Sequence, residues 1–143
     1  MTNPVNPFQR CVPLLDLLKI TPVAYSPGHA TFQMVVEEPH LRTLRLMHGG
    51  VAATLLDTAL GCAAGSRAPQ GHYVVTVHLN INFIRPAWEG EKLLAIGETI
   101  HTGQQTVVAR GEIRTADKVL VASATGTFMF LPHTEKAGDA VES

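Results

Sequence analysis

Hydrophobic and polar residues alternate through the second half of the chain, which is the pattern of strands that bury one face. The clearest run covers residues 75–83, where apolar side chains from Val75 to Phe83 alternate with polar ones such as Thr76. The same period predicts three further strands, over residues 92–101, 106–115 and 119–131. Their apolar faces carry, in chain order, Leu94, Ile96 and Ile100; Val107, Ala109 and Ile113; and Leu120, Ala122, Ala124, Phe128 and Phe130.

The first half of the chain contains shorter elements. Leucines at helical spacing predict a short helix within residues 9–19, and Pro13 restricts where it begins. Residues 20–25 are predicted to form a strand, and a turn of sequence SPGH leads into a second strand over residues 30–36. Residues 38–47 then form a loop, a place where ligand contacts concentrate.

Residues 47–64 are predicted to form one buried helix, because small and apolar residues cover every face after its first turn. Asp57 is the only ionisable side chain in the body of that helix. Burying an unpaired carboxylate costs on the order of several kcal/mol, so a functional use for Asp57 is expected. His48, Gly49 and Gly50 open the helix, and two residues without Cβ leave backbone N–H groups accessible to a ligand.

Two strands, one helix and four more strands predict an α+β fold. Short links favour antiparallel pairing of consecutive strands. The predicted helix is roughly 24 to 27 Å long, which matches strands of about 11 to 13 residues. We therefore expect a six-stranded antiparallel sheet wrapped around one long central helix. The expected division is an N-terminal arm with the short helix over residues 1–20, one domain over residues 21–131 and a polar tail over residues 132–143.

Composition narrows the possible partners. The chain has 143 residues, of which 45% are hydrophobic, enough for one domain with its own core. A formal net charge of -1 at pH 7 gives no reason to expect binding to nucleic acid or to a membrane. Cys11 and Cys62 are expected to be reduced thiols, and no leader or membrane span is visible, so we expect a cytoplasmic protein.

Sequence motifs exclude several kinds of chemistry. The histidines show no metal-ligand spacing, so we expect no metal site. G-x-S-x-G is absent, which argues against a serine hydrolase. No cofactor is expected either.

The chain resembles a known family in three features taken together. These are the motif H-G-G at residues 48–50, an acid at Asp57 in the helix that follows, and a strand ending N-I-N-F-I-R-P at residues 80–86. The combination is similar to the hotdog-fold acyl-CoA thioesterases of the phenylacetate-pathway (PaaI-like) type, which are related to the 4-hydroxybenzoyl-CoA thioesterases. The resemblance covers roughly residues 21–131.

The resemblance implies a role for each matching residue. Asp57 would activate water or attack the thioester itself, the Gly49 N–H would polarise the thioester carbonyl, and Thr76 would assist from the next strand. Many members have Asn or Gln about six residues before the His, whereas this chain has Arg42 and Thr43 in a loop one residue shorter.

Thr76 and the remaining candidates also have plainer interpretations. Strict alternation puts Thr76 opposite Val75 and Val77, so its place in a site requires a bulge or a subunit edge. Asp57 could pair with Arg42, Arg45 or Arg67. His48, a catalytic candidate, could merely cap the helix, and Gly50, a substrate-binding candidate, could merely permit tight packing. Arg42 and Arg85 are expected to contact substrate, Arg85 through CoA phosphates unless it is a solvated strand end.

Helix geometry adds a constraint. Eight residues separate Gly49 from Asp57, a rise of about 12 Å, which is too far for both to act on one carbonyl. We therefore expect a homodimer with offset helices, in which Gly49 of one copy faces Asp57 of the other. The resemblance implies the same arrangement, and a homotetramer as the larger assembly.

The predicted function is hydrolysis of an aryl or medium-chain acyl-CoA to the free acid and CoA. Two alternatives remain. One is a hotdog hydratase or dehydratase acting on acyl-CoA through an Asp and His pair, and the other is a non-catalytic acyl-CoA binding module. Only the thioesterase would release a free thiol.

Overall fold

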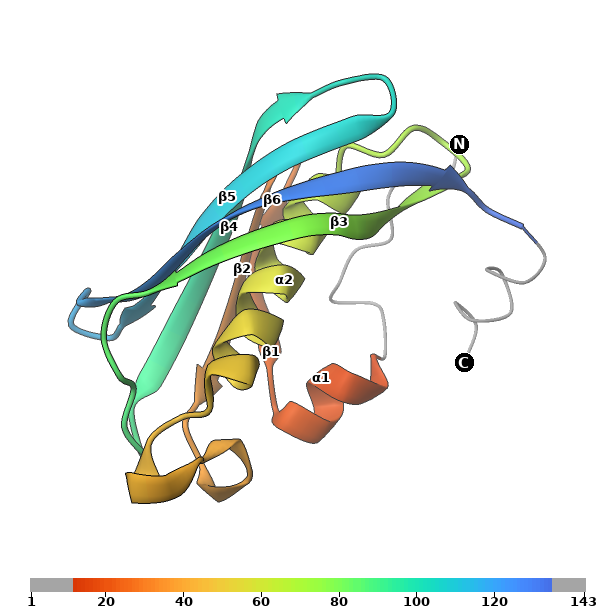
Figure 1. Cartoon of the computed structure of the whole chain (residues 1–143). Helices are drawn as coiled ribbons and strands as arrows, with labels where there is room; N and C mark the ends of the chain where they lie inside the picture. The colour runs from red at the N-terminus through yellow and green to blue at the C-terminus, as the bar shows by residue number, and fades with distance from the viewer. Residues whose placement is uncertain (1–11, 135–143) are drawn as a thin grey trace.

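The structure is a computed structural model that describes residues 12–134 (Figure 1). The start of the predicted arm, residues 9–11 of the predicted first helix and most of the predicted tail lie outside the described residues. The helices and strands are α1 (Pro13–Leu18), β1 (Thr21–Ser26), β2 (His29–Val35), α2 (Gly49–Gly65), β3 (His72–Phe83), β4 (Lys92–Thr102), β5 (Thr106–Thr115) and β6 (Leu120–Pro132). Two short 3-10 turns, η2 (Glu38–His40) and η3 (Thr43–Arg45), precede α2.

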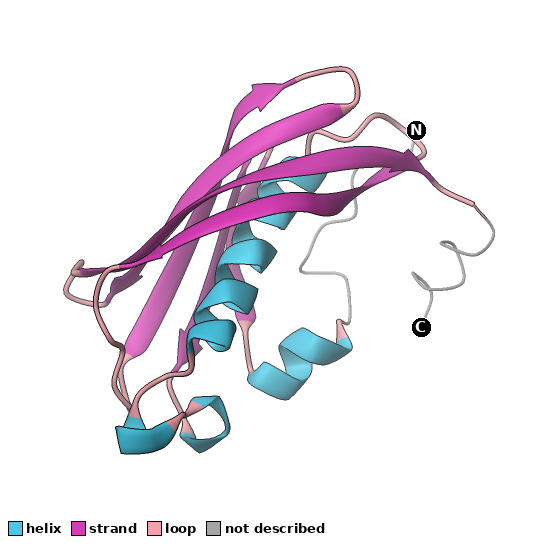
Figure 2. Cartoon of the chain, viewed as in Figure 1, coloured by secondary structure: helices cyan, strands magenta, loops and turns pink. Residues whose placement is uncertain are grey.

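The six strands form one antiparallel sheet in the order β1-β2-β4-β5-β6-β3. The sheet curves around α2, which lies in its hollow, while α1 lies to one side of α2 and packs on the core through Leu15 and Leu18 (Figures 1 and 2). This confirms the predicted six-stranded sheet around one long helix.

The strand pairing differs from the prediction at one place. β3 and β4 are consecutive in sequence but do not pair; β3 lies against β6, and β4 lies between β2 and β5. The link over residues 84–91 is long enough to carry the chain from the edge of the sheet past two strands, so the rule of short links does not apply to it. As a result β3 is an edge strand with one neighbour.

α2 buries one side against the sheet and leaves the other half-exposed. Its buried residues are Ala52, Leu55, Leu56, Ala59, Leu60, Ala63 and Ala64. The sheet approaches so closely that a Cβ on Gly97 would lie 2.5 Å from the Ala59 carbonyl oxygen, so only glycine fits there. The expectation of a helix buried on every face is wrong for the single chain, and Asp57 lies on the half-exposed side.

The sheet faces follow the predicted pattern in β5 and most of β6, where Val107, Ala109, Ile113 and Phe128 are buried. The prediction is wrong for β4. Leu93 and Ala95 face the core, whereas Ile96 and Ile100 are 39% and 52% exposed and Leu94 is half-buried. The sequence L-L-A-I is apolar at both alternating sets of positions, so the period cannot identify the inner one.

The apolar face predicted for residues 75–83 is only partly buried. Leu79 and Ile81 pack against the core, but Val75, Val77 and Phe83 are 36%, 55% and 61% exposed. The bulge between Thr76 and His78 shifts the alternation, so that Thr76 reaches Asp57 of α2 and its neighbour Val75 faces away from the helix.

α1 is shorter than the predicted helix. Pro13 occupies its first turn, where the missing N–H costs nothing, and Lys19 ends it in a left-handed conformation. Neither helix of residues 12–134 is long and apolar enough to cross a membrane.

Candidate active site

Asp57 receives a hydrogen bond from Thr76. The Thr76 Oγ1 donates to the Asp57 Oδ1 over 2.8 Å. The pairing of β3 with β6 is irregular between Thr76 and His78, and this bulge is one of the two alternatives, a bulge or a subunit edge, that strict alternation left open for Thr76. The bond holds the carboxylate in one orientation and occupies one of its oxygens.

A pocket of about 480 Å³ opens beside this pair, a volume typical of ligand sites. Its polar and ionisable lining residues are Asp16, Thr54, Asp57, Thr58 and Thr76. The rest of its lining is apolar or weakly polar: Val12, Leu14, Leu15, Ile20, Pro22, Phe32, Gly61, Cys62, Val74 and Phe128. Such a pocket is suited to an apolar group joined to a polar centre near the carboxylate.

The first turn of α2 is held by its N-cap residue. The His48 Nδ1 accepts from the Gly50 N–H over 2.8 Å, so this ring caps the helix as its plainer interpretation proposed. A Cβ on Gly50 would lie 3.0 Å from the same nitrogen, which explains a glycine there. The Gly49 N–H has no acceptor among residues 12–134 and is the donor available to a ligand.

A second pocket, of about 330 Å³, opens at this end of α2. Gly49, Arg42, Phe83 and Arg85 all line it. The structure therefore brings together the predicted amide donor and two predicted substrate-binding arginines from three segments of the chain. Its two arginines make it the more basic of the two pockets.

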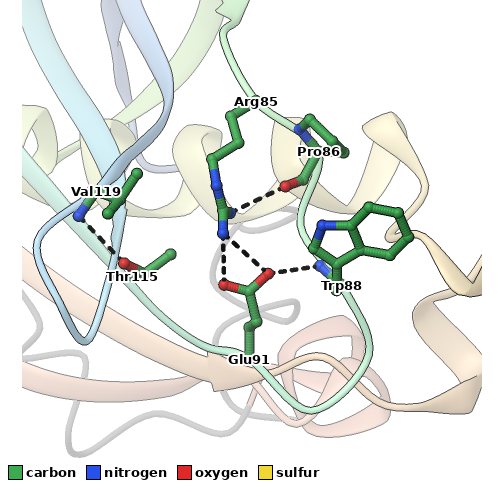
Figure 3. A network of polar contacts seen from close by, with 6 residues as sticks. All are labelled: Arg85, Pro86, Trp88, Glu91, Thr115 and Val119. Atoms are coloured by element: carbon green, nitrogen blue, oxygen red, sulfur yellow. Dashed lines mark hydrogen bonds and ion pairs between the residues drawn. The ribbon is translucent and has the colours of Figure 1, made fainter.

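Arg85 is held by Glu91, as Figure 3 shows. The Arg85 Nη2 lies 3.0 Å from the Glu91 Oε2, and the Trp88 N–H donates to the Glu91 Oε1 over 2.9 Å. Partial burial acts to raise the pKa of Glu91, but the hydrogen bonds from Trp88 and Arg85 outweigh it and the pKa lies below its ordinary value. Sequence analysis did not single out Glu91, which buttresses the turn before β4.

None of the three arginines proposed as partners of Asp57 pairs with it in the described part of the chain. Arg45 forms an ion pair with Glu89, whose hydrogen bond raises the pKa of Arg45. Arg42 donates to the Thr43 hydroxyl and Arg67 to a main-chain carbonyl. The purely structural interpretation of Asp57 as a buried ion pair therefore has no support.

His40 is a buried residue that sequence analysis missed. It is 2% exposed, its Nδ1 accepts from the Glu37 N–H over 2.9 Å, and its Nε2 then carries the proton donated to the Leu18 carbonyl at 2.7 Å. Its own carbonyl accepts from the His48 N–H. His40 thus joins the end of α1 to the start of α2, and no sequence motif indicates this.

The two pockets lie at different levels of α2. Gly49 lines one and Asp57 the other, and eight residues of continuous helix separate them. One chain does not bring the amide and the carboxylate together, in agreement with the spacing argument.

Comparison with known proteins identifies the family. The profile of the thioesterase superfamily matches residues 44–122, which include the start of α2, Asp57 and Thr76. The chain belongs to the thioesterase superfamily. A relative from Archaeoglobus fulgidus, provisionally named an esterase, is 31% identical over 80% of this chain and 72% of its own length.

Two further proteins that resemble this chain support the family assignment. The medium/long-chain acyl-CoA thioesterase YigI of Escherichia coli is 29% identical over 59% of this chain, and the match spans 62% of YigI. The solved structure of the E. coli PaaI protein from the phenylacetic acid degradation operon has a TM-score of 0.73 at 31% identity and covers 80% of this chain and 86% of PaaI. The predicted family and the predicted class of enzyme, a thioester hydrolase, are confirmed.

Proposed function

We propose that this thioesterase hydrolyses acyl-CoA at a site shared by two copies of the chain. The observation that carries the proposal is the Thr76–Asp57 hydrogen bond beside a largely apolar pocket, together with the Gly49 amide at the start of the same helix, which has no acceptor among residues 12–134. The acyl group would occupy the pocket beside Asp57, with the thioester carbonyl bound by the Gly49 N–H of the second copy.

The chemistry needs little beyond these groups. An amide donor aimed at the developing oxyanion contributes on the order of 3 kcal/mol. Asp57 would act as a general base on water, typically worth about 10²–10⁴ in rate, or attack the thioester to form an anhydride. The CoA thiolate leaves readily, so neither a strong general acid nor a cofactor is needed. A single turnover in isotopically labelled water separates the two routes, because the anhydride route can transfer an Asp57 oxygen to the product.

The edge strand β3 supports a dimer. Along its open edge, main-chain N–H and C=O groups have no neighbouring strand in the described part of the chain. Pairing two β3 strands about a two-fold axis would join these groups by hydrogen bonds and place two α2 helices side by side. The offset that brings Gly49 of one copy to Asp57 of the other follows from the helix rise between them.

Arg42 and Arg85 would contact the phosphates of CoA at the pocket that Gly49 lines. The Glu91 ion pair fixes the Arg85 guanidinium at that pocket before substrate arrives. This assignment keeps the basic pocket for the nucleotide end of the substrate and the apolar pocket for the acyl end.

The first test follows thiol release from a panel of aryl and aliphatic acyl-CoAs. We expect release by the wild type and a loss of at least an order of magnitude in Asp57→Ala, with dimer mass and unfolding temperature retained. A hydratase would change the acyl group without releasing thiol, and a binding module would only bind it. An active Asp57→Ala enzyme would remove Asp57 from the mechanism.

Mixed dimers test the shared site directly. Asp57→Ala and Gly49→Pro each disable a different half of every site. Unfolded and refolded together in equal amounts, they form hybrids with one intact site, and about a quarter of wild-type activity returns. No recovery in verified hybrids would mean that both groups of a site come from one chain.

A further inference from the structure

The pocket beside Asp57 is bounded on one side by α1. Val12, Leu14 and Leu15 belong to its lining, and across from them the lining comes from α2 and β3. Figure 1 shows α1 standing away from α2, which packs on the sheet instead. The pocket lies in the space that separates the two helices.

We propose that α1 is the end wall of the acyl pocket and limits the length of a linear aliphatic acyl chain. This rests on the proposed function and names its substrate class. Apart from the carboxylates of Asp16 and Asp57 and the hydroxyls of three threonines, the lining is formed by aliphatic side chains, the Cys62 thiol and the rings of Phe32 and Phe128. Each buried methylene of the acyl group therefore adds affinity until the acyl chain reaches α1.

The wall is fixed in place by several contacts. Leu15 and Leu18 pack against the core, and the Ile20 N–H donates to the Leu15 carbonyl over 2.9 Å. The buried His40 ring donates to the Leu18 carbonyl over 2.7 Å. A helix of six residues would not hold a position by itself, so these anchors make α1 a boundary for the ligand.

α1 also contains its own control position. Leu14 and Leu17 are 51% and 74% exposed, so substitution at either leaves the core intact. Only Leu14 lines the pocket. Tryptophan at position 14 would project into the acyl space, whereas tryptophan at position 17 would lie in solvent.

The experiment measures kcat/KM by thiol release for saturated acyl-CoAs of increasing length. In the wild type we expect a rise of about fourfold per methylene, equivalent to about 0.8 kcal/mol, up to a length at which the rise stops. Leu14→Trp should stop the rise at least two carbons earlier, and Leu15→Ala should let it continue about two carbons further. Leu17→Trp should match the wild type.

The outcomes separate the two proposals. If the wild type releases no thiol from any acyl-CoA, the proposed function fails. If it hydrolyses acyl-CoAs but Leu14→Trp and Leu15→Ala both keep the wild-type length limit, α1 is not the wall. Leu14→Trp decides the matter alone if Leu15→Ala loses stability, because Leu14 is outside the core.

Discussion

The two regions of α2 that form the proposed site are built in different ways. At its start, the useful group is the main-chain N–H of Gly49, which is exposed beside the Gly50 N–H that His48 caps and is flanked by arginines. Two turns further on, the useful group is the side chain of Asp57, held by Thr76 beside an apolar pocket. Position 49 should tolerate any residue that keeps its main-chain N–H, whereas position 57 should tolerate almost no change of functional group.

Gly49→Pro tests the main-chain half of this comparison and should have a larger effect than Thr76→Val or Glu91→Gln. Proline is accepted at the first position of a helix, and His48 already has the extended conformation (φ -64, ψ 136) that a following proline requires. The substitution therefore removes the donor while keeping the helix. We expect kcat to fall by about 10²–10³, measured by thiol release.

Gly49→Ala is the matched control. Its Cβ would lie 3.4 Å from the Phe83 ring, near ordinary van der Waals contact, and its N–H remains. It should keep kcat within about tenfold of the wild type, since the donor that Gly49→Pro removes is worth far more. Equal losses in both variants would show that a side chain at position 49, and not the missing donor, causes the defect.

Thr76→Val tests the side-chain half and should have a smaller effect. It preserves the shape of the residue but removes the hydrogen bond to Asp57. Hydrogen bonds to charged groups are worth about 1.5–3 kcal/mol, so a fall of about tenfold or more in kcat is expected, with little change in KM. Thr76→Ser retains the hydroxyl and should recover most of the rate; a fully active Thr76→Val would make Thr76 a strand residue only.

Sequence patterns predicted the elements that are set by the order of apolar and polar residues. They missed features that are set by contacts between segments far apart in the chain. Residues 47–64 were correctly predicted as the central helix because no other element is as apolar. A bulge at Thr76 was one of two alternatives, with a subunit edge, that followed from strict alternation combined with the family resemblance, and the structure has the bulge. The inner face of β4 could not be predicted, because Leu93 and Leu94 are equally apolar and only the close approach of α2 at Gly97 favours one face.

The contacts of His40 and Glu91 were also beyond the reach of sequence patterns. Both are side chains that hydrogen-bond to main-chain groups, and in a sequence these look like any loop residue. The edge position of β3 depends on where the link over residues 84–91 leads the chain. Long-range topology of this kind leaves no periodic signal.

Glu91→Gln has the smallest effect and concerns the support of the main-chain region. The pKa of Glu91 is lowered in the folded chain, because the Trp88 and Arg85 hydrogen bonds outweigh its burial. A lowered pKa contributes stability above the unfolded-state value of about 4.5 and loses it as the pH falls through the folded value. Acidification from about pH 6 to about pH 3 should therefore reduce the free energy of unfolding more in the wild type than in Glu91→Gln.

Urea unfolding across that range measures this difference, and Glu89→Gln is the comparison variant. The ion pair of Glu89 with Arg45 is more exposed than that of Glu91 with Arg85, so solvent screens it and its loss should change the free energy of unfolding less. Parallel profiles for the wild type and Glu91→Gln would mean that the Arg85–Glu91 pair contributes no net stability. In that case Arg85 would have to be ordered at the Gly49 pocket by the substrate, and Glu91→Gln should raise KM for acyl-CoA only slightly.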